Sequence, residues 1–292
     1  MKILCYIFFG CFFFQLSGFA QQKRALVVAI SEYPKHTGWN RIHADNDLKI
    51  LIPILEKQGF LKKNSIVLEN EQATKDNIIQ ALKTLEQNCK KGDLVYIHFS
   101  CHGQQMEDDN GDEPDGLDES LIPYDAQMHF RKGKYEGEKH LRDDELDVFL
   151  LAIRKKLKDN GNLIVSLDAC HSQSGDRGED EEEVFVRGTS AIFSQQVGYK
   201  GKISDNQVDT PLVQAEGLAP ITIISACMSY QKNYEYKAED NYYYGILTYS
   251  ICSIGKQYPI LTSSNQWLDE VEKLMKKKTK LQIPVIETTL HK

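Results

Sequence analysis

Two short segments of this chain contain the residue types that perform nucleophilic catalysis. The first is Ser100-Cys101-His102-Gly103-Gln104, and the second is Asp168-Ala169-Cys170-His171-Ser172. A thiolate is the attacking form of cysteine, and a neighbouring imidazole either takes the proton of the thiol or lowers its pKa. The two segments therefore predict a nucleophile, Cys170, and a base, His102.

The same segments offer donors for the negative charge that develops when a carbonyl group is attacked. Backbone N–H groups stabilise such an oxyanion, and we expect them from Gly103, which allows close approach, and from Cys170 itself. The competing interpretation is that Cys170 is a buried apolar side chain, as most cysteines are. A zinc site at Cys101-His102 and Cys170-His171 is disfavoured, because adjacent residues point apart.

Both segments follow short apolar runs that are typical of buried parallel strands, at residues 93–100 and 162–168. If these strands are neighbours, about 4.8 Å apart, His102 and Cys170 reach one crevice at the carboxyl edge of the sheet, where ligands bind in such folds. Strands alternating with helices predict an α/β fold with a mostly parallel sheet covered on both faces. Further strands are expected at 23–30, 65–68, 221–227 and, as an edge, 281–287, and helices at 45–60 (interrupted at Pro53), 73–89, 143–157, 245–254 and 266–278.

Two acidic stretches interrupt this alternation. Residues 107–125 are poor in aliphatic side chains, and we expect a surface loop there. Residues 176–216 show little periodicity and contain the run Glu179-Asp180-Glu181-Glu182-Glu183. A stretch of this length within a compact domain is typical of a functional or disordered segment.

Composition excludes several classes of function. The 292 residues include 35 Lys plus Arg and 42 Asp plus Glu, which gives a formal charge of −7. Proteins that bind nucleic acid collect basic residues on one surface, so we expect no nucleic-acid partner. The hydrophobic fraction of 41% excludes global disorder.

The first 20 residues have the pattern of a secretory signal peptide. Lys2 is followed by an apolar run from Ile3 to Leu16 and by small residues that end at Ala20. We expect cleavage near Ala20, export to the periplasm or the medium, and no membrane attachment afterwards. Loss of Cys5 and Cys11 from the seven cysteines leaves five, an odd number that predicts at least one unpaired thiol.

These motifs resemble those of the caspase-like cysteine peptidases (peptidase family C14), specifically the metacaspase and bacterial caspase-like branch. Ser100–Gly103 is similar to the S-G-H-G segment of that family, and Asp168–Ser172 to its D-x-C-H-S segment. Further similarities lie in Asp45-Asn46-Asp47, in the acidic loop from Gly111 to Glu119 and in Tyr244–Thr248, a loosened G-x-F-T segment. The resemblance implies a caspase-haemoglobinase-like three-layer sandwich with a mostly parallel six-stranded sheet.

The resemblance also implies roles for particular residues. Cys170 becomes the nucleophile and His102 its partner, while Asp47, Ser100 and Asp168 form the S1 pocket. Paired carboxylates there would select Arg or Lys at P1. A simpler interpretation of Asp45 and Asp47 is that they stabilise the start of the helix that they open.

Some relatives are activated by calcium, and the matching positions here are Asp118, Asp143, Asp144 and Asp176. Hard carboxylate oxygens suit calcium, but Asp143 and Asp144 have the alternative role of capping the helix that follows. We expect no cofactor for the chemistry itself and treat Ca²⁺ as an activator.

The resemblance divides the chain into residues 1–20 (signal peptide) and 21–292 (one peptidase domain). The domain comprises a large-subunit-like part at 21–175, an acidic linker at 176–218 and a small-subunit-like part at 219–292. Relatives cut this linker, so Arg177, Arg187, Lys200 and Lys202 are candidate self-processing sites. An uncut acidic lid is the alternative.

We therefore expect an exported cysteine endopeptidase that cleaves proteins or peptides after Arg or Lys. Two other functions stay open. Cys101 and Gln173 stand where the family has glycine, so the chain could instead be a catalytically weak module that binds calcium or a protein. Another Cys/His acyl-transfer hydrolase, such as an amidase or ligase, would use the same pair.

Overall fold

The computed structural model describes residues 21–111, 113–170, 185–201, 212, 215–229, 231–262 and 264–290. The expected signal peptide, Asp176, Arg177 and Lys202 lie outside the described residues. Among the described residues, no helix has the length and apolar content needed to span a bilayer.

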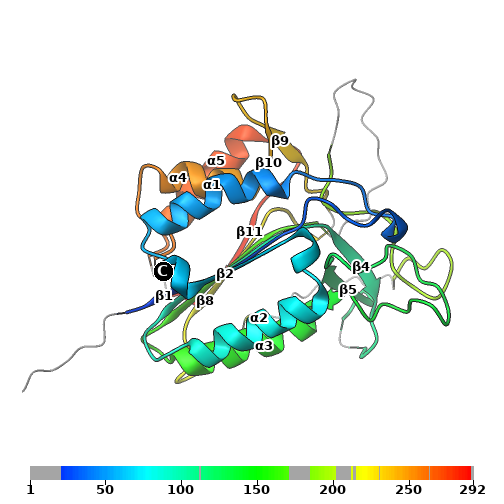
Figure 1. Cartoon of the computed structure of the whole chain (residues 1–292), viewed down its shortest axis with the longest axis horizontal. Coiled ribbons are helices and arrows are strands. Elements are labelled where there is room, and N and C mark those ends of the chain that lie inside the picture. Colours follow the sequence, from blue (N-terminus) through cyan, green and yellow to red (C-terminus); the bar gives the residue numbers. More distant parts are fainter. Residues whose placement is uncertain are drawn as a thin grey trace, which may run out of the picture.

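A six-stranded sheet forms the centre of the molecule, in the order β11-β8-β7-β3-β1-β2 (Figure 1). All neighbouring strands are parallel except β11, which runs antiparallel to β8 at the edge. The strands are β1 (Lys23–Ala29), β2 (Ser65–Glu69), β3 (Leu94–Ser100), β7 (Asn162–Asp168), β8 (Ile221–Ser225) and β11 (Val285–Thr288). The predicted mostly parallel, six-stranded α/β fold is confirmed.

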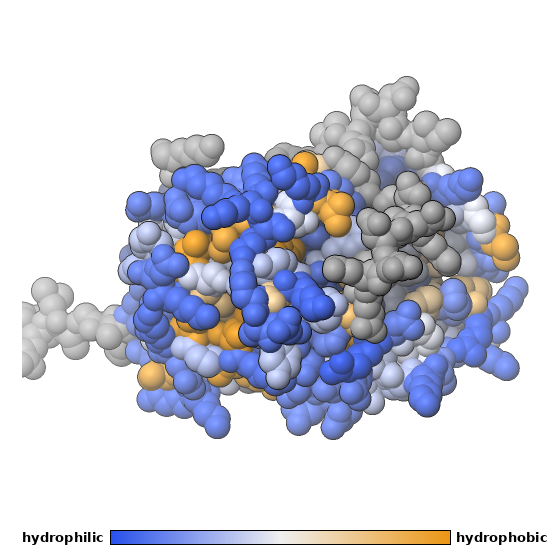
Figure 2. Space-filling model, turned by 90° about the horizontal axis from the view of Figure 1, so that it is seen from above, coloured by the Kyte–Doolittle hydropathy of each residue, from blue (hydrophilic) through white to orange (hydrophobic). Residues whose placement is uncertain are grey.

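Five helices cover the two faces of this sheet. Strand β1 shows why: Leu26 and Val28 point to one apolar cluster, and Ala25 and Val27 point to the other. The first cluster is covered by α2 (Lys75–Asn88) and α3 (Asp143–Leu157), and the second by α1 (Ala44–Lys57), α4 (Ile246–Gly255) and α5 (Gln266–Lys278). Figure 1 shows the three layers, and Figure 2 shows that the outer face above the second helix layer is mostly hydrophilic, with apolar residues in separate patches.

Two small sheets lie beyond the central one. Strands β4 (Gly103–Glu107), β5 (Leu117–Leu121) and β6 (Leu141–Arg142) form an antiparallel sheet directly after β3, and β9 (Glu235–Lys237) pairs with β10 (Tyr243–Gly245). Single-turn helices occur at η1 (Lys35–Thr37), η2 (Lys62–Asn64) and η3 (Asn70–Gln72). These small sheets matter because they border the crevice that holds the candidate site.

Two expectations about local structure are wrong. The first helix continues through Pro53 to Lys57, because its apolar face, including Leu51 and Leu55, stays buried against the sheet and offsets the missing backbone hydrogen bond. The expected surface loop at 107–125 contains β5, whose ends Leu117 and Leu121 are buried. Its few apolar residues suffice because β4 supplies the backbone hydrogen bonds.

Candidate active site

The two catalytic segments lie at neighbouring strand ends. Strands β3 and β7 are paired in parallel, with Ser100 level with Asp168. His102 and Cys170 each follow two residues later, so the crevice expected from the sequence is present. Both side chains are almost fully buried, at 2% and 1% exposure.

His102 is held in one orientation. Its Nε2 lies 2.8 Å from the carbonyl oxygen of Asn40, and its ring stacks on Trp39 at 4.9 Å and contacts Tyr33 at 5.2 Å. Since a carbonyl only accepts, Nε2 carries the proton and Nδ1 keeps its lone pair. Nδ1 has no hydrogen-bond partner among the described residues. Burial lowers the pKa of His102 to about 4, although the contact with Asn40 opposes this shift, so the ring is a neutral base.

The thiol of Cys170 contacts two residues that follow β8, Gln231 and Cys227. Its Sγ donates to the carbonyl of Gln231 at 2.6 Å, and it also contacts Cys227, a contact that together with burial raises the pKa of the Cys227 thiol. None of the five cysteines that the structure describes forms a disulfide. The prediction that at least one thiol stays outside a disulfide is therefore confirmed, and it holds for all five described cysteines.

The site is filled by a segment of the chain itself. Residues 185–188 cross the crevice, with Val186 bridged to Tyr234 and Gly188 bridged to Gly103, and the chain bends at Arg187 between these two bridges. The N–H of Arg187 donates to Asn233 O at 2.9 Å. This segment comes from the acidic linker, yet it is bound as a peptide substrate would be.

The carbonyl oxygen of Arg187 occupies the predicted oxyanion position. It accepts from the N–H of Cys170 at 2.8 Å and from the N–H of Gly103 at 3.3 Å. The two donors expected from the sequence thus converge on one carbonyl. Gly188 lies against the nucleophile, because a Cβ added to it would lie 2.3 Å from Cys170 O and 3.2 Å from Cys170 Cβ.

The guanidinium of Arg187 fills the predicted pocket and has no exposed surface. Its NH1 donates to Asp47 Oδ2 and to Ser100 Oγ, each at 2.7 Å, and lies 3.8 Å from Asp168 Oδ1. Burial alone would lower the pKa of Arg187, but the surrounding carboxylates, with Asp47 first, outweigh this and raise it. The three residues expected to form S1 are therefore brought together around a basic side chain.

A fourth pocket residue, Glu235, was missed by sequence reasoning. Its Oε1 accepts from Nε of Arg187 at 3.1 Å and from NH2 at 2.9 Å, and its Oε2 contacts His43 Nδ1 at 2.5 Å. Burial would raise the pKa of Glu235, but Arg187 and then His43 lower it, so the carboxylate is charged. The available signal was the alternation Asn233-Tyr234-Glu235, which places two polar side chains on one face of an extended segment.

Two of the S1 carboxylates, Asp47 and Asp168, are held by the loosened G-x-F-T segment. The N–H of Gly245 donates to Asp47 at 3.0 Å, and Thr248 donates to Asp168 through its N–H at 2.8 Å and its hydroxyl at 2.6 Å. A Cβ on Gly245 would lie 2.5 Å from NH1 of Arg187, so only glycine leaves room for the guanidinium. Burial raises the pKa of Asp47 to about 7, with Arg187 opposing the shift. Asp47 is therefore not a helix cap, and the N-terminal residue of α1 receives no side-chain cap.

The positions matched to calcium are only partly together. Asp118 forms an ion pair with Arg142, whereas Asp143 accepts from the N–H of Asp144 at 3.0 Å in the first turn of α3. Burial, and then the charge of a neighbouring carboxylate, raises the pKa of Glu119 to about 8. In the part of the chain that the structure describes, no three His, Cys, Asp or Glu side chains are arranged to hold a metal ion.

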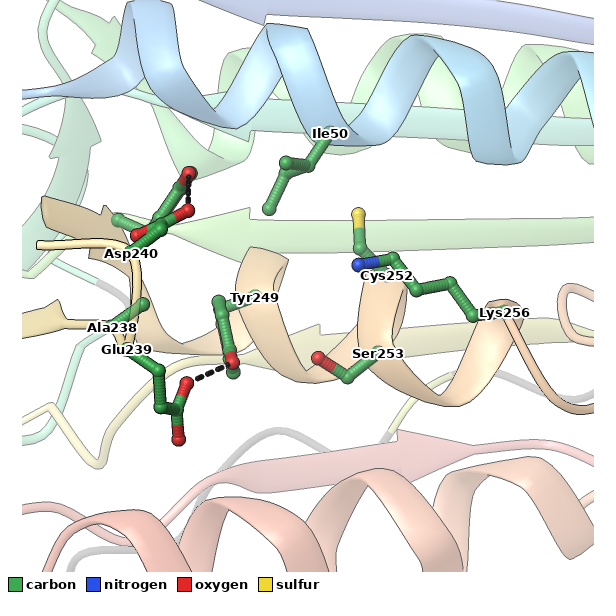
Figure 3. Close-up of a pocket in the computed structure, with 9 residues that line it drawn as sticks. Ile50, Ala238, Glu239, Asp240, Tyr249, Cys252, Ser253 and Lys256 are labelled. Atoms are coloured by element: carbon green, nitrogen blue, oxygen red, sulfur yellow. Dashed lines mark hydrogen bonds between the residues drawn. The ribbon is translucent and has the colours of Figure 1, made fainter. Parts of the chain in front are cut away.

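A surface hollow of about 180 Å³ lies elsewhere, between α1, β10 and α4 (Figure 3). It is lined by Ile50, Tyr249, Cys252 and Lys256, among others, and two tyrosines there donate to Glu239 and Asp240. Neither Cys170 nor His102 contributes to it, and burial raises the pKa of Cys252 well above its usual value. This hollow is therefore separate from the candidate active site.

The fold and the arrangement of this site are those of the caspase-like class of proteins. Comparison with known proteins agrees: the caspase domain family matches residues 22–292, and the chain belongs to that family. It is 34% identical over 158 residues to Metacaspase-2 of Arabidopsis thaliana, a match that covers 52% of this chain and 34% of the relative. It is 33% identical over 127 residues to Metacaspase-1 of Eremothecium gossypii, covering 41% and 25%.

The curated relatives are longer proteins, and the matches span only a quarter to a third of their lengths. A crystal structure of a Geobacter sulfurreducens protein aligns over 91% of this chain and 93% of its own, with a TM-score of 0.60 and 23% identity. That likeness supports the fold.

Proposed function

We propose that this chain is a cysteine endopeptidase that cleaves after arginine, and that its own Arg187–Gly188 bond is a substrate. The observation that carries the proposal is the position of Arg187. Its guanidinium lies among Asp47, Ser100 and Glu235, while its carbonyl oxygen accepts from both candidate oxyanion donors. A side chain that merely stabilised the fold would not need its carbonyl between those two N–H groups.

The chemistry follows from this geometry. Sγ of Cys170 attacks the carbonyl carbon of Arg187 while Nδ1 of His102 accepts the thiol proton. The N–H groups of Gly103 and Cys170 stabilise the oxyanion. The intermediate collapses as His102 protonates the departing amine of Gly188, which leaves Arg187 as a thioester on Cys170. Water then attacks the thioester while His102 takes a proton from that water. The second intermediate expels the thiolate of Cys170, which regains the proton from His102, and Arg187 is released with a free carboxylate.

Selectivity for arginine over lysine follows from the number of partners. A guanidinium reaches Asp47 and Ser100 through one nitrogen and Glu235 through two others. The single ammonium group of lysine cannot contact Asp47 and Glu235 at the same time. We therefore infer that both basic residues enter the pocket and that arginine is preferred.

The other candidate cleavage positions have no such support. Lys200 follows Tyr199, whose hydroxyl donates to Gly116 O at 3.1 Å, in the connection between β4 and β5. Arg177 and Lys202 lie outside the described residues. Self-processing is therefore proposed at the bond after Arg187.

The test is a time course of the purified chain, its Cys170→Ala variant and its His102→Ala variant, each with and without calcium. Intact-mass measurement should find a break between Arg187 and Gly188 in the unsubstituted chain, and none in either variant. Persistence of the full-length chain in every sample would contradict self-processing. A panel of short fluorogenic peptides with Arg, Lys, Asp or Leu before the reporter then tests specificity, and cleavage of none of them would favour a binding module or another acyl-transfer reaction.

Calcium is proposed as an activator, with a revised set of ligands. Glu119 and Asp143 are both partly buried, and desolvation is the main cause that raises the pKa of Asp143 to about 7. A cation would relieve the mutual repulsion of these carboxylates, and hard oxygens are what calcium prefers. Asp118, which is paired with Arg142, does not fit this role. We expect calcium to raise the melting temperature of the Cys170→Ala protein. We expect no such rise when Asp143→Asn is added to the same protein.

Export is proposed from the sequence of residues 1–20 alone. Expression of the full chain in a bacterial host, followed by N-terminal sequencing of the periplasmic and extracellular fractions, tests it. A mature chain that begins near Gln21 supports export, and an intact leader on cytoplasmic protein contradicts it.

A further inference from the structure

The linker continues past the crevice and pairs with a second element, strand β4. Gly188 is bridged in parallel to Gly103, and Phe193 in parallel to Met106. The backbone of Phe193 is satisfied on both sides, because its N–H donates to Gln105 O at 2.8 Å and its carbonyl accepts from Glu107 N at 3.0 Å. The linker is thus bridged at Gly188 and at Phe193 to the edge of β4 that β5 leaves open, and it bends at Ser190 between these two bridges.

The side chain of Phe193 occupies an aromatic pocket. It is 3% exposed and lies 4.5 Å from the ring of His140, 5.7 Å from Tyr135 and 5.9 Å from Phe130, measured between ring centroids. Met106 belongs to the same apolar cluster. The pocket is closed beneath the ring by Gly137, where an added Cβ would lie 2.9 Å from Phe193.

A buried polar network supports this pocket and contacts the bound backbone. Nε2 of Gln104 donates to the carbonyl of Ala191 at 2.8 Å, and Oε1 of Gln104 contacts Nε2 of His140 at 3.0 Å. Nδ1 of His140 in turn contacts the hydroxyl of Tyr135 at 2.8 Å. Because Gln104 is fully buried, its amide is fixed in advance to receive one peptide carbonyl.

We propose that the edge of β4, the Gln104 amide and the pocket around Phe193 form a substrate-binding subsite on the leaving-group side of the scissile bond. It takes an extended peptide with an aromatic residue at the sixth position after the cleaved bond, which is Phe193 in this chain. The inference rests on the proposed cleavage after Arg187 and extends it to the substrate class: peptides with arginine and, six residues later, a large aromatic residue.

The architecture favours a subsite over simple packing. Backbone pairing at an open strand edge binds any extended peptide, and one deep side-chain pocket supplies selectivity, which is a common mode of peptide recognition. The same strand, β4, begins at the oxyanion donor Gly103 and ends beside the aromatic pocket. A peptide aligned by this strand is therefore placed in register with the catalytic site.

The first experiment measures self-cleavage in a cell-free synthesis time course. Phe193→Ala should cut the Arg187–Gly188 bond about tenfold to a hundredfold more slowly, as the loss of one buried aromatic contact implies, and Phe193→Tyr should restore most of the rate. The matched control is Val197→Ala, since Val197 is fully exposed. The same variants are assayed on a short acyl-arginine fluorogenic substrate, which does not reach the pocket, and Phe193→Ala should cleave it at least as well as the unsubstituted chain.

The second experiment does not depend on catalysis. The full-length Cys170→Ala/Phe193→Ala protein lacks the ring that fills the aromatic pocket. It is titrated into a fluorescein-labelled peptide with the sequence of residues 188–196, Gly-Thr-Ser-Ala-Ile-Phe-Ser-Gln-Gln, and binding is measured by fluorescence anisotropy. We expect this peptide to bind at least about tenfold more tightly than the same peptide with alanine in place of phenylalanine. Equal binding of the two peptides, or an unchanged self-cleavage rate in Phe193→Ala, would overturn the subsite. Selective binding without any cleavage by the unsubstituted chain would keep the subsite and refute the proposed peptidase function.

Discussion

The two halves of the bound linker segment are held by different kinds of interaction. Before the scissile bond, Arg187 is a buried cation surrounded by carboxylates from three parts of the chain. After it, Phe193 is a buried apolar ring beside a paired strand edge. A buried ion pair is costly to break on one side, because the remaining charge loses its compensation, whereas removal of an apolar group costs in proportion to the lost contact. The first half therefore sets an all-or-none requirement, and the second half a graded preference.

The substitution Arg187→Gln tests the first half of the segment and has the largest expected effect on self-cleavage and stability. We expect self-cleavage to fall by more than about a thousandfold and the free energy of unfolding by roughly 3–5 kcal/mol at neutral pH, since Asp47 and Glu235 stay buried without a cation. Without Arg187 the pKa of Asp47 rises further, so the variant is most stable at acid pH and loses stability as pH rises through that pKa. Urea unfolding of both proteins in the Cys170→Ala background, at pH 5 and pH 8, measures this. Arg187→Lys is the control, and equal stability of Arg187→Gln at the two pH values would contradict the ionised pocket.

A second change sharpens the comparison within the first half. Glu235→Gln removes the charge that faces two guanidinium nitrogens but leaves Asp47 and Ser100 in place. We expect kcat/KM for arginine substrates to fall about a hundredfold and that for lysine substrates much less, so that the preference for arginine narrows. Fluorogenic peptides that differ only at this residue give the ratio. If both substrates lose the same factor, Glu235 supports the fold of the pocket and does not select the side chain.

The bond itself provides the third test. An added Cβ at Gly188 meets the carbonyl of Cys170 at 2.3 Å, so Gly188→Ala must move the scissile bond away from its donors. We expect self-cleavage to slow about tenfold to a hundredfold. The control is Val197→Ala, because the Val197 side chain is fully exposed. A normal rate in Gly188→Ala would show that the segment is not bound in a reactive register.

The smallest expected effect concerns pH. Because burial lowers the pKa of His102 to about 4, the imidazole stays neutral through the ordinary range and gains a proton only near that value. Self-cleavage should hold a plateau down to about pH 5 and then decline. Since the unfolded pKa of histidine is about 6.5, the stability associated with neutral His102 is complete above that pH and decreases as pH falls from about 6.5 toward 4. Melting curves of Cys170→Ala separate unfolding from the loss of the base, and a midpoint of the rate profile near 6.5 would contradict a buried neutral imidazole.

Much of the fold could be predicted because its signals are local. Apolar runs and 3.6-residue periodicity placed every strand of the central sheet and all five helices, with the bounds of β7, α3 and α5 correct to the residue. The small strands β4, β5, β6, β9 and β10 escaped because each has at most five residues and none contains an apolar run or an alternating pattern long enough to be recognised. The predicted interruption at Pro53 was wrong because burial of the apolar face of α1 offsets the backbone hydrogen bond that the proline removes.

The candidate site shows the same division. Cys170, His102 and Gly103 could be located from motifs at strand ends, and Asp47, Ser100 and Asp168 from the resemblance to the caspase-like family. The structure places these residues together. Arg187 was one of four basic residues in the linker, and no local pattern distinguished it. Its selection depends on a pocket whose walls come from residues 47, 100, 168 and 235, and that information exists only in the folded chain.

The position of the proposed cut between β7 and β8 has a consequence for the cleaved protein. The parts of the chain before and after the Arg187–Gly188 bond share one sheet, because β7 pairs with β8 along five residues. They also share a helix layer, in which α4 packs on α1. Cleavage would therefore give a nicked protein that migrates as one particle under native conditions and as two chains after denaturation. The new carboxylate and ammonium would be held near each other at high local concentration, each anchored on its own side. Opening of the crevice would then be governed by how quickly one anchored end dissociates, and not by hydrolysis alone.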